Sequence, residues 1–228
     1  MKKLLLVVLI VLVASSAFAQ LQLEADFGYF FNSDNYDGVK RSFNGIDLII
    51  TPRYFFTENI GLFFAGDFKA WFSANNDEYA DMFKSAGMTV TIDDTIGFKL
   101  DLAFGLAFAY PVNDKFGLQS DLGVSFTVLI YEGITGDVSY LGSTMSFGIF
   151  PDKVKSMGFY ANVFGRYLVM EDKTGKGYLT FGAKIDYKFT REESGRVVVS
   201  GISQKYSGKE NNFSGFSIAP FIGFLAIF

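Results

Sequence analysis

Apolar and polar residues alternate strictly along much of this chain. In the clearest segment, 96–110, every even position carries a large apolar side chain and every odd position a small or charged one. Successive side chains of a β-strand point to opposite faces, so this alternation predicts a strand with one apolar and one polar face. The segment 116–130 repeats the pattern, apart from Ser120 on its apolar face, and the polar turn 111–115 lies between the two. The two segments therefore predict a long hairpin.

The predicted strands are long for a water-soluble protein, in which most strands have about five or six residues. A strand that crosses a membrane at a tilt near 45° needs about nine to eleven residues, plus extensions into the two interfaces. Segments that begin near residues 21, 46, 62, 145, 159, 179 and 216 alternate in the same way. The pattern therefore predicts an all-β protein, a single transmembrane antiparallel up-and-down β-barrel.

The number of strands depends on two segments with poor alternation, 143–150 and 196–206. With both counted as strands the barrel has about ten, which is the number we prefer, and without them it has about eight. Both numbers close the sheet and leave no unpaired strand edge in lipid.

The predicted connections alternate in length. The short ones lie near 56–59, 111–115, 151–156 and 191–195. The others lie near 33–42, 75–94, 132–142, 171–176 and 207–212, and the first three of these are longer. Because outer-membrane barrels have short periplasmic turns and longer extracellular loops, we expect the first set in the periplasm and the second outside the cell.

The beginning of the chain has the features of a secretory signal peptide. Two lysines precede an apolar run over residues 4–14, and an A-x-A cleavage pattern ends at residue 19. The apolar run is shorter than the about 20 residues that a membrane-spanning helix needs. We therefore expect a cleaved signal peptide over 1–19 and one barrel domain over 20–228.

Charged residues occupy the polar faces of the predicted strands, so we expect them to point into the lumen. Glu24, Asp26 and Lys188 are three of them. The proposed lumen network consists of Asp47, Arg53, Asp67, Lys69, Lys99, Asp101, Asp121, Arg166, Lys184 and Asp186. A barrel of about eight strands is just wide enough for side chains to fill, and buried charges must pair. The favoured interpretation is a solid salt-bridged plug, and the alternative is a narrow water path lined by these groups.

The composition excludes several classes of function. The chain contains no histidine and no cysteine, which excludes Ser-His-Asp and Cys-His nucleophilic sites and the usual zinc ligands. Without the two lysines of the signal peptide, about 18 basic residues face 24 acidic ones, whereas nucleic-acid binding needs clustered basic residues. We expect no enzymatic activity, no cofactor, no metal and no nucleic-acid partner.

The last segment of the chain places Ile222, Phe224, Ala226 and the final Phe228 at alternate positions. Together with the signal peptide and the strands, it resembles the small bacterial outer-membrane β-barrel proteins of the OmpA-barrel, OmpX and OmpW group. The resemblance covers the mature chain and is architectural, and Pro220 and Ala226 stand where larger apolar residues are usual. It implies an outer-membrane location, with outer-membrane lipid, periplasmic chaperones and the barrel-assembly machinery as partners, and Phe228 as the assembly signal.

These features predict a non-enzymatic outer-membrane protein with a structural or surface-interaction role. It would display extracellular loops, of which 75–94 is the longest, to a ligand outside the cell. Two alternatives stay open. One is a small pore or conduit for small or hydrophobic solutes, and the other is a soluble lipocalin-like binding barrel with its polar face outward.

Overall fold

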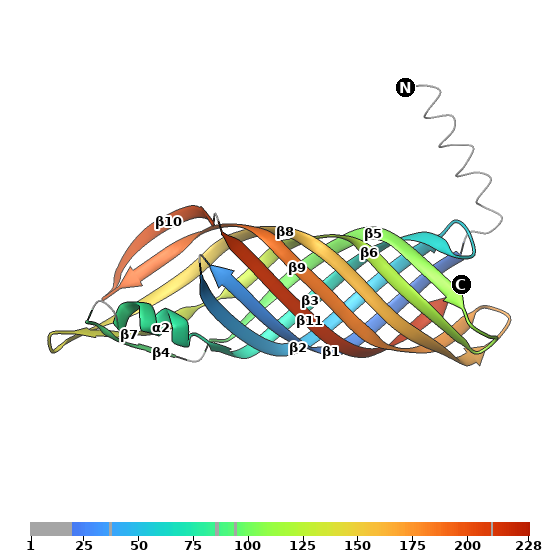
Figure 1. Ribbon diagram of the computed structural model, residues 1–228, viewed down its shortest axis with the longest axis horizontal. Coiled ribbons are helices and arrows are strands. Elements are labelled where there is room, and N and C mark those ends of the chain that lie inside the picture. Colours follow the sequence, from blue (N-terminus) through green and yellow to red (C-terminus); the bar gives the residue numbers. More distant parts are fainter. Residues whose placement is uncertain (1–19, 37, 85–86, 94, 211) are drawn as a thin grey trace, which may run out of the picture.

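The computed structural model describes residues 20–36, 38–84, 87–93, 95–210 and 212–228, so the predicted signal peptide lies outside the described residues. The described chain is a long barrel of tilted antiparallel strands (Figure 1). Its strands are β1 (Gln20–Tyr36), β2 (Val39–Phe55), β3 (Ile60–Asn75), β4 (Thr89–Ile92), β5 (Gly97–Pro111), β6 (Phe116–Glu132), β7 (Ile134–Tyr140), β8 (Ser143–Glu171), β9 (Lys176–Val199), β10 (Ile202–Glu210) and β11 (Phe213–Ile227). One helix, α2 (Asp77–Lys84), follows β3. Among the described residues, no helix is long and apolar enough to cross a membrane.

Within the described chain, eight strands form a closed antiparallel ring. The order is β1-β2-β3-β5-β6-β8-β9-β11, and β11 pairs again with β1. At the seam, the amide of Phe228 donates a hydrogen bond of 3.0 Å to the carbonyl of Leu21. Because each strand of the ring has two neighbours, the backbone groups of the ring are paired without a free edge.

The preferred count of ten strands is wrong for this ring. The strand β8 runs through the weak segment 143–150 and through the predicted turn 151–156, and β9 runs through the predicted turn 191–195. Val154 is buried beside the exposed Lys155, so the inward and outward alternation continues where the outward residues stop being apolar. The sequence analysis used an apolar face to recognise a strand. The strands β8 and β9 continue beyond the point where that apolar face ends.

The two ends of the ring differ. The start of β1, the end of β11 and the tight turns 56–59, 112–115 and 172–175 lie at one end, which we call the terminal end. The first two turns agree with the prediction, whereas the connection near 171–176 was expected at the opposite end. It is a compact turn because Asp172 accepts hydrogen bonds from the Thr174 hydroxyl and from the amides of Thr174 and Gly175, which lower the pKa of this carboxyl.

At the opposite end, β8 and β9 continue past the ring, and three further strands extend the same sheet there. β10 pairs with β9, β7 pairs with β8 and β4 pairs with β7, which gives the order β10-β9-β8-β7-β4 (Figure 1). The helix α2 packs against β4 and β2. We call β4, β7, β10 and the extensions of β8 and β9 the distal sheet. It is built chiefly from 75–94 and 132–142, which the sequence pattern assigned to loops, and from 143–150 and 196–206, the two segments with poor alternation.

The charged faces of the ring strands point inward and the apolar faces point outward. On β1, for example, Glu24 is fully buried, whereas Phe27 is 57% exposed and Phe31 is 52% exposed. The core of the protein is therefore the lumen itself. This arrangement is the reverse of a lipocalin-like barrel, so that alternative is wrong, because a water-soluble barrel buries its apolar face.

Candidate functional site

The outward apolar side chains form a belt around the ring. On β9 the belt runs from Leu179 to Phe189, and on β8 from Met157 to Tyr167. Each stretch covers ten residue steps, which at about 3.3 Å per residue and a tilt near 45° span a height of about 24 Å. This height matches the apolar band of about 25 Å that outer-membrane barrels present to lipid.

All ten charged residues of the predicted network point into the lumen. Nine of them are buried, and Arg166 is half-buried near the terminal end. The structure brings the nine together in two groups of ion pairs, one around Arg53 and one around two lysines. They lie on five strands, β2, β3, β5, β6 and β9, and ion pairs such as Lys184–Asp67 connect opposite walls of the ring.

The Arg53 group links three strands near the terminal half of the lumen. The Arg53 guanidinium donates to both oxygens of Asp121, from Nε at 2.9 Å and from Nη2 at 2.6 Å. Its Nη2 also lies 2.6 Å from Glu24 Oε2, in an ion pair outside hydrogen-bond geometry. Asn162 donates a hydrogen bond of 3.3 Å to Asp121, and the guanidinium stacks 4.9 Å from the centre of the Phe164 ring. One cation thus holds two carboxylates in the middle of the barrel.

The second group is centred on two fully buried lysines. Lys184 Nζ donates to Asp47 at 2.5 Å and to Asp67 at 2.6 Å. Lys69 Nζ lies 3.0 Å from Asp67 and 3.3 Å from Asp101. Because Asp67 touches both ammonium groups, the two lysines share one continuous network.

The network continues toward the distal end through two further lysines. Lys99 Nζ lies 3.5 Å from Asp101, and Lys188 Nζ lies 3.2 Å from Asp186. The hydroxyls of Thr127 and Ser125 donate to Asp101 and Asp186, both at 2.6 Å. Hydroxyl donors of this kind satisfy carboxylate oxygens that an ammonium does not reach.

Aromatic side chains also pack inside the lumen, next to the ion pairs. Phe30, Phe43 and Trp71 form a buried cluster on the distal side, and Lys69 lies 6.0 Å from the centre of the Phe30 ring. Phe63, which lies opposite Arg53 in the register of β2 and β3, stacks on Tyr160 with ring centres 5.4 Å apart. Ion pairs and aromatic rings therefore share the lumen.

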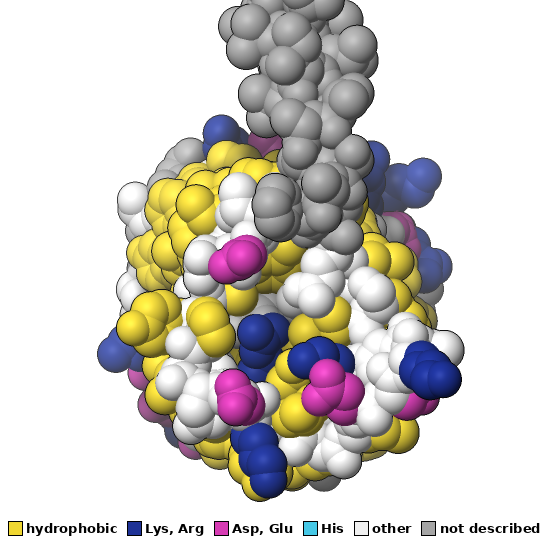
Figure 2. Space-filling view, turned by 90° about the vertical axis from the view of Figure 1, so that its right-hand side faces the viewer, with side chains coloured by type: hydrophobic (Ala, Val, Ile, Leu, Met, Phe, Trp, Pro, Cys, Tyr) yellow, Lys and Arg dark blue, Asp and Glu magenta, His cyan; other side chains and the backbone are white. Residues whose placement is uncertain are grey.

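The described lumen contains a small cavity among its distal ion pairs and a hollow at its terminal end. A cavity of about 20 Å³ lies beside Arg41, Lys99 and Lys188, which is room for about one water molecule. At the terminal end a hollow of about 330 Å³ is lined by the turn 111–117, Arg166 and its neighbours (Figure 2).

The sequence analysis did not predict the charged residues at the distal end of the lumen. Arg41 forms an ion pair with Glu132, and both side chains are almost fully buried. Farther from the terminal end, Arg191 forms an ion pair of 2.6 Å with Glu193, and the Tyr206 hydroxyl donates a hydrogen bond to the same carboxylate. Burial and this hydrogen bond raise the pKa of the Tyr206 hydroxyl. The charged residues among them lie in predicted loops and turns. The signal that identifies Arg41 is the period of two, which continues along β2 from the buried Phe43 to the buried Arg41.

The distal sheet has an apolar inner face. A cavity of about 290 Å³ lies against it, and apart from Asn76 its lining is apolar. The apolar lining residues are Ile92, Ile134, Val138, Met145, Phe147, Ile149, Val197 and Val199. They come from four neighbouring strands of the distal sheet, and Met145 and Val199 are about two-fifths exposed.

Comparison with solved structures places this architecture among known barrels. A major outer membrane protein from Thermus thermophilus matches with a TM-score of 0.51 and 13% identity, over 92% of this chain and 99% of that chain. This chain has the fold of a bacterial outer-membrane β-barrel protein. Neisserial surface protein A matches with a TM-score of 0.45, 14% identity and coverage of 90% and 95%. Ail, the attachment invasion locus protein of Yersinia pestis, matches with a TM-score of 0.39, 12% identity and coverage of 91% and 98%.

No protein-family model and no curated protein matches the sequence. The resemblance to small outer-membrane barrels that the sequence suggested is confirmed at the level of architecture. The fold also agrees with the predicted outer-membrane location. The belt of exposed apolar side chains gives the physical reason, because exposing so large an apolar surface to water is unfavourable.

Proposed function

We propose that this outer-membrane barrel is a non-enzymatic surface protein, in which a sealed lumen supports a binding platform outside the cell. The platform is the distal sheet. The observation that carries the proposal is the continuation of β8 and β9 from the belt into this sheet, where apolar residues line a cavity of about 290 Å³. This volume is close to the lower end of known ligand pockets, of about 300 to 1,000 Å³.

The orientation follows from the lengths of the connections. Three tight turns mark the terminal end, whereas strands and a helix extend the distal end. Short turns are typical of the periplasmic side of outer-membrane barrels and long connections of the extracellular side. We therefore place the terminal end in the periplasm and the distal sheet outside the cell.

The plugged lumen supports a role at the surface. Each ion pair of the two networks would have to open before a hydrated solute could pass, and each carboxylate left without its cation would carry a desolvation cost. The second candidate, a small conduit, is favoured only by the hollow of about 330 Å³ at the terminal end.

Export and assembly complete the proposal. The signal peptide over 1–19 would deliver the chain to the periplasm, where chaperones and the barrel-assembly machinery would receive it. Phe228 supports its proposed role as assembly signal, because it follows the last strand and its amide closes the seam with β1.

A photoreactive fatty acid tests the platform. The purified barrel in amphipol is irradiated with a diazirine-bearing fatty acid, and the modified peptides are mapped by mass spectrometry. We expect crosslinks in the segment 134–149 in addition to the belt, and we expect Val138→Asp to remove the first set only. Thr89→Asp, on the exposed face of β4, is the matched control and should leave both sets. Crosslinks confined to the belt in the unmodified protein would refute the platform.

A further inference from the structure

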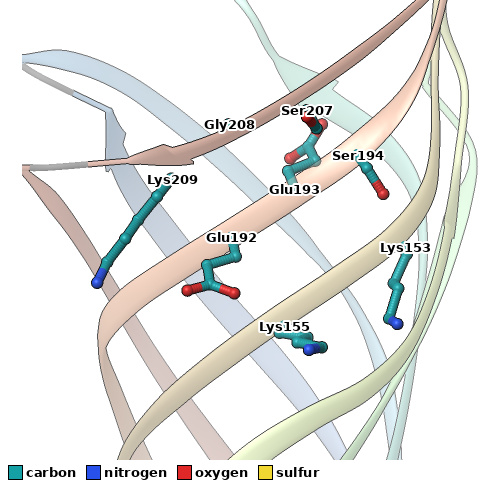
Figure 3. A pocket seen from close by; sticks show the side chains of 8 residues that line it. All are labelled: Lys153, Lys155, Glu192, Glu193, Ser194, Ser207, Gly208 and Lys209. Atoms are coloured by element: carbon teal, nitrogen blue, oxygen red, sulfur yellow. The ribbon is translucent and has the colours of Figure 1, made fainter.

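We propose that three outward lysines, Lys153, Lys155 and Lys209, bind the phosphate groups of an anionic lipid in the outer leaflet. We call these residues the lysine patch. They lie on the outer surface of β8 and β10, on both sides of β9, around a cavity of about 340 Å³ (Figure 3). The inference rests on the orientation proposed above and is independent of the apolar cavity.

Strand register brings the three lysines together. Lys155 lies opposite Glu192 of β9, and Glu192 lies opposite Lys209 of β10. The Cα atoms of Lys155 and Lys209 are thus two strand spacings apart, about 10 Å, and those of Lys153 and Lys155 are about 7 Å apart. Long flexible side chains at these separations can direct their ammonium groups at one phosphorylated headgroup.

The lysine patch carries charge that the protein does not neutralise. Among the described residues, no ion pair involves Lys153, Lys155 or Lys209, whereas the lumen lysines all have carboxylate partners. Two acidic residues lie nearby. The Glu193 carboxylate forms an ion pair with Arg191 and accepts a hydrogen bond from Tyr206. Among the described residues that line the cavity, Glu192 is therefore the one free carboxylate that opposes the three lysines.

The patch is continuous with the lipid-facing belt. Met157, the last belt residue of β8 on this side, is two residues from Lys155, about 7 Å along the strand. Just below, Phe159 and Phe189 pack against each other with ring centres 5.2 Å apart on the outer surface. A lipid beside β8 and β9 would therefore place its acyl chains on these rings and its headgroup phosphates at the lysines. This continuity favours a membrane lipid over a free anion.

The test compares lipid binding by charge variants of the full barrel. Native mass spectrometry measures how much lipid A the detergent-purified protein retains. We expect the variant Lys153→Gln, Lys155→Gln, Lys209→Gln to bind about a hundredfold more weakly, since each of the three lysines near an anionic headgroup contributes about a fivefold increase in binding. The control variant Lys115→Gln, Lys173→Gln, Lys205→Gln removes the same charge from exposed positions outside the patch and should bind as the unmodified protein does.

Two further measurements test whether the lysines bind lipid phosphate or a free anion. Glu192→Gln should strengthen lipid A binding if the lysines face phosphate, and should weaken it if Glu192 only orders the lysines. Inorganic phosphate, added alone, should compete poorly. Equal lipid retention by the patch variant and the control variant, with both folded by heat-modified mobility, would overturn the proposal. Full competition by inorganic phosphate would also overturn it, because the site would then recognise a free anion.

Discussion

Arg53 illustrates how a barrel stores charge in its interior. Its guanidinium is fully buried and holds Asp121 with two hydrogen bonds, while Glu24 lies against the same Nη2 atom. Taking one cation away leaves two carboxylates without a partner, which costs more than the ion pair contributes when it is complete.

We predict that Arg53→Met lowers the free energy of unfolding by about 3 to 5 kcal/mol. Urea titration of the folded barrel in lipid vesicles measures this change, with the fluorescence of the single tryptophan, the buried Trp71, as the probe. Lys173→Met, on an exposed turn, should change the free energy by less than about 0.5 kcal/mol. Adding Glu24→Gln and Asp121→Asn to Arg53→Met should restore much of the loss, and no recovery in this triple variant would contradict the charge explanation.

Gly97 is small because Trp71 occupies the space beside it. A Cβ atom at Gly97 would lie 2.3 Å from Cζ2 of the Trp71 ring. We predict that Gly97→Val destabilises the barrel by about 1 to 3 kcal/mol and shifts the emission of Trp71. Gly66→Ala, where a Cβ meets nothing within 4 Å, is the control and should leave the spectrum unchanged.

At the residue scale, the structure places the ten residues of the predicted network on the inner face of the barrel. The ten charged residues were chosen by parity along each strand, and parity alone fixes which face a side chain occupies. It does not fix partners: the contact of Lys184 with both Asp47 and Asp67 depends on which strands meet across the lumen. Arg41 and Arg191 were missed because their segments had been assigned to loops.

At the scale of elements, β8 and β9 decide the architecture. With 29 and 24 residues, they are longer than the belt requires, and the excess forms the distal sheet. The sequence pattern did not predict the continuation of these strands where their outward residues become polar, as at Lys153 and Glu192. A strand that has left the membrane is expected to have polar outward residues. In these extensions the side chains still alternate between inward and outward, but the outward ones are no longer apolar.

Cysteine labelling tests the orientation of these elements. The chain has no cysteine, so Ser143→Cys, at the start of β8, and Lys173→Cys, in the opposite turn, each introduce a single thiol. We predict that a maleimide carrying a long polyethylene glycol chain modifies Ser143→Cys on intact cells. It should reach Lys173→Cys only after the outer membrane is permeabilised, and the opposite pattern would invert our assignment of the two ends.

At the scale of the molecule, the barrel combines an outward apolar belt, a lumen that contains ion pairs and aromatic rings, and a distal sheet with an apolar inner face. The fold class and the membrane-facing surface follow from period-two alternation, which needs no tertiary information. The number of ring strands and the distal sheet do not, because they depend on where a long strand changes its environment and its neighbours. The prediction of ten strands failed at that point.

The sealed lumen is the central claim, and single-channel conductance tests it most directly. The purified barrel is inserted in a planar bilayer, and its heat-modified mobility shows that it is folded. We predict no discrete conductance steps, because Arg53, Lys69 and Lys184 hold their carboxylates across the lumen. Reproducible steps whose ion selectivity changes in Asp101→Ala would show a water path past these residues and would contradict the account.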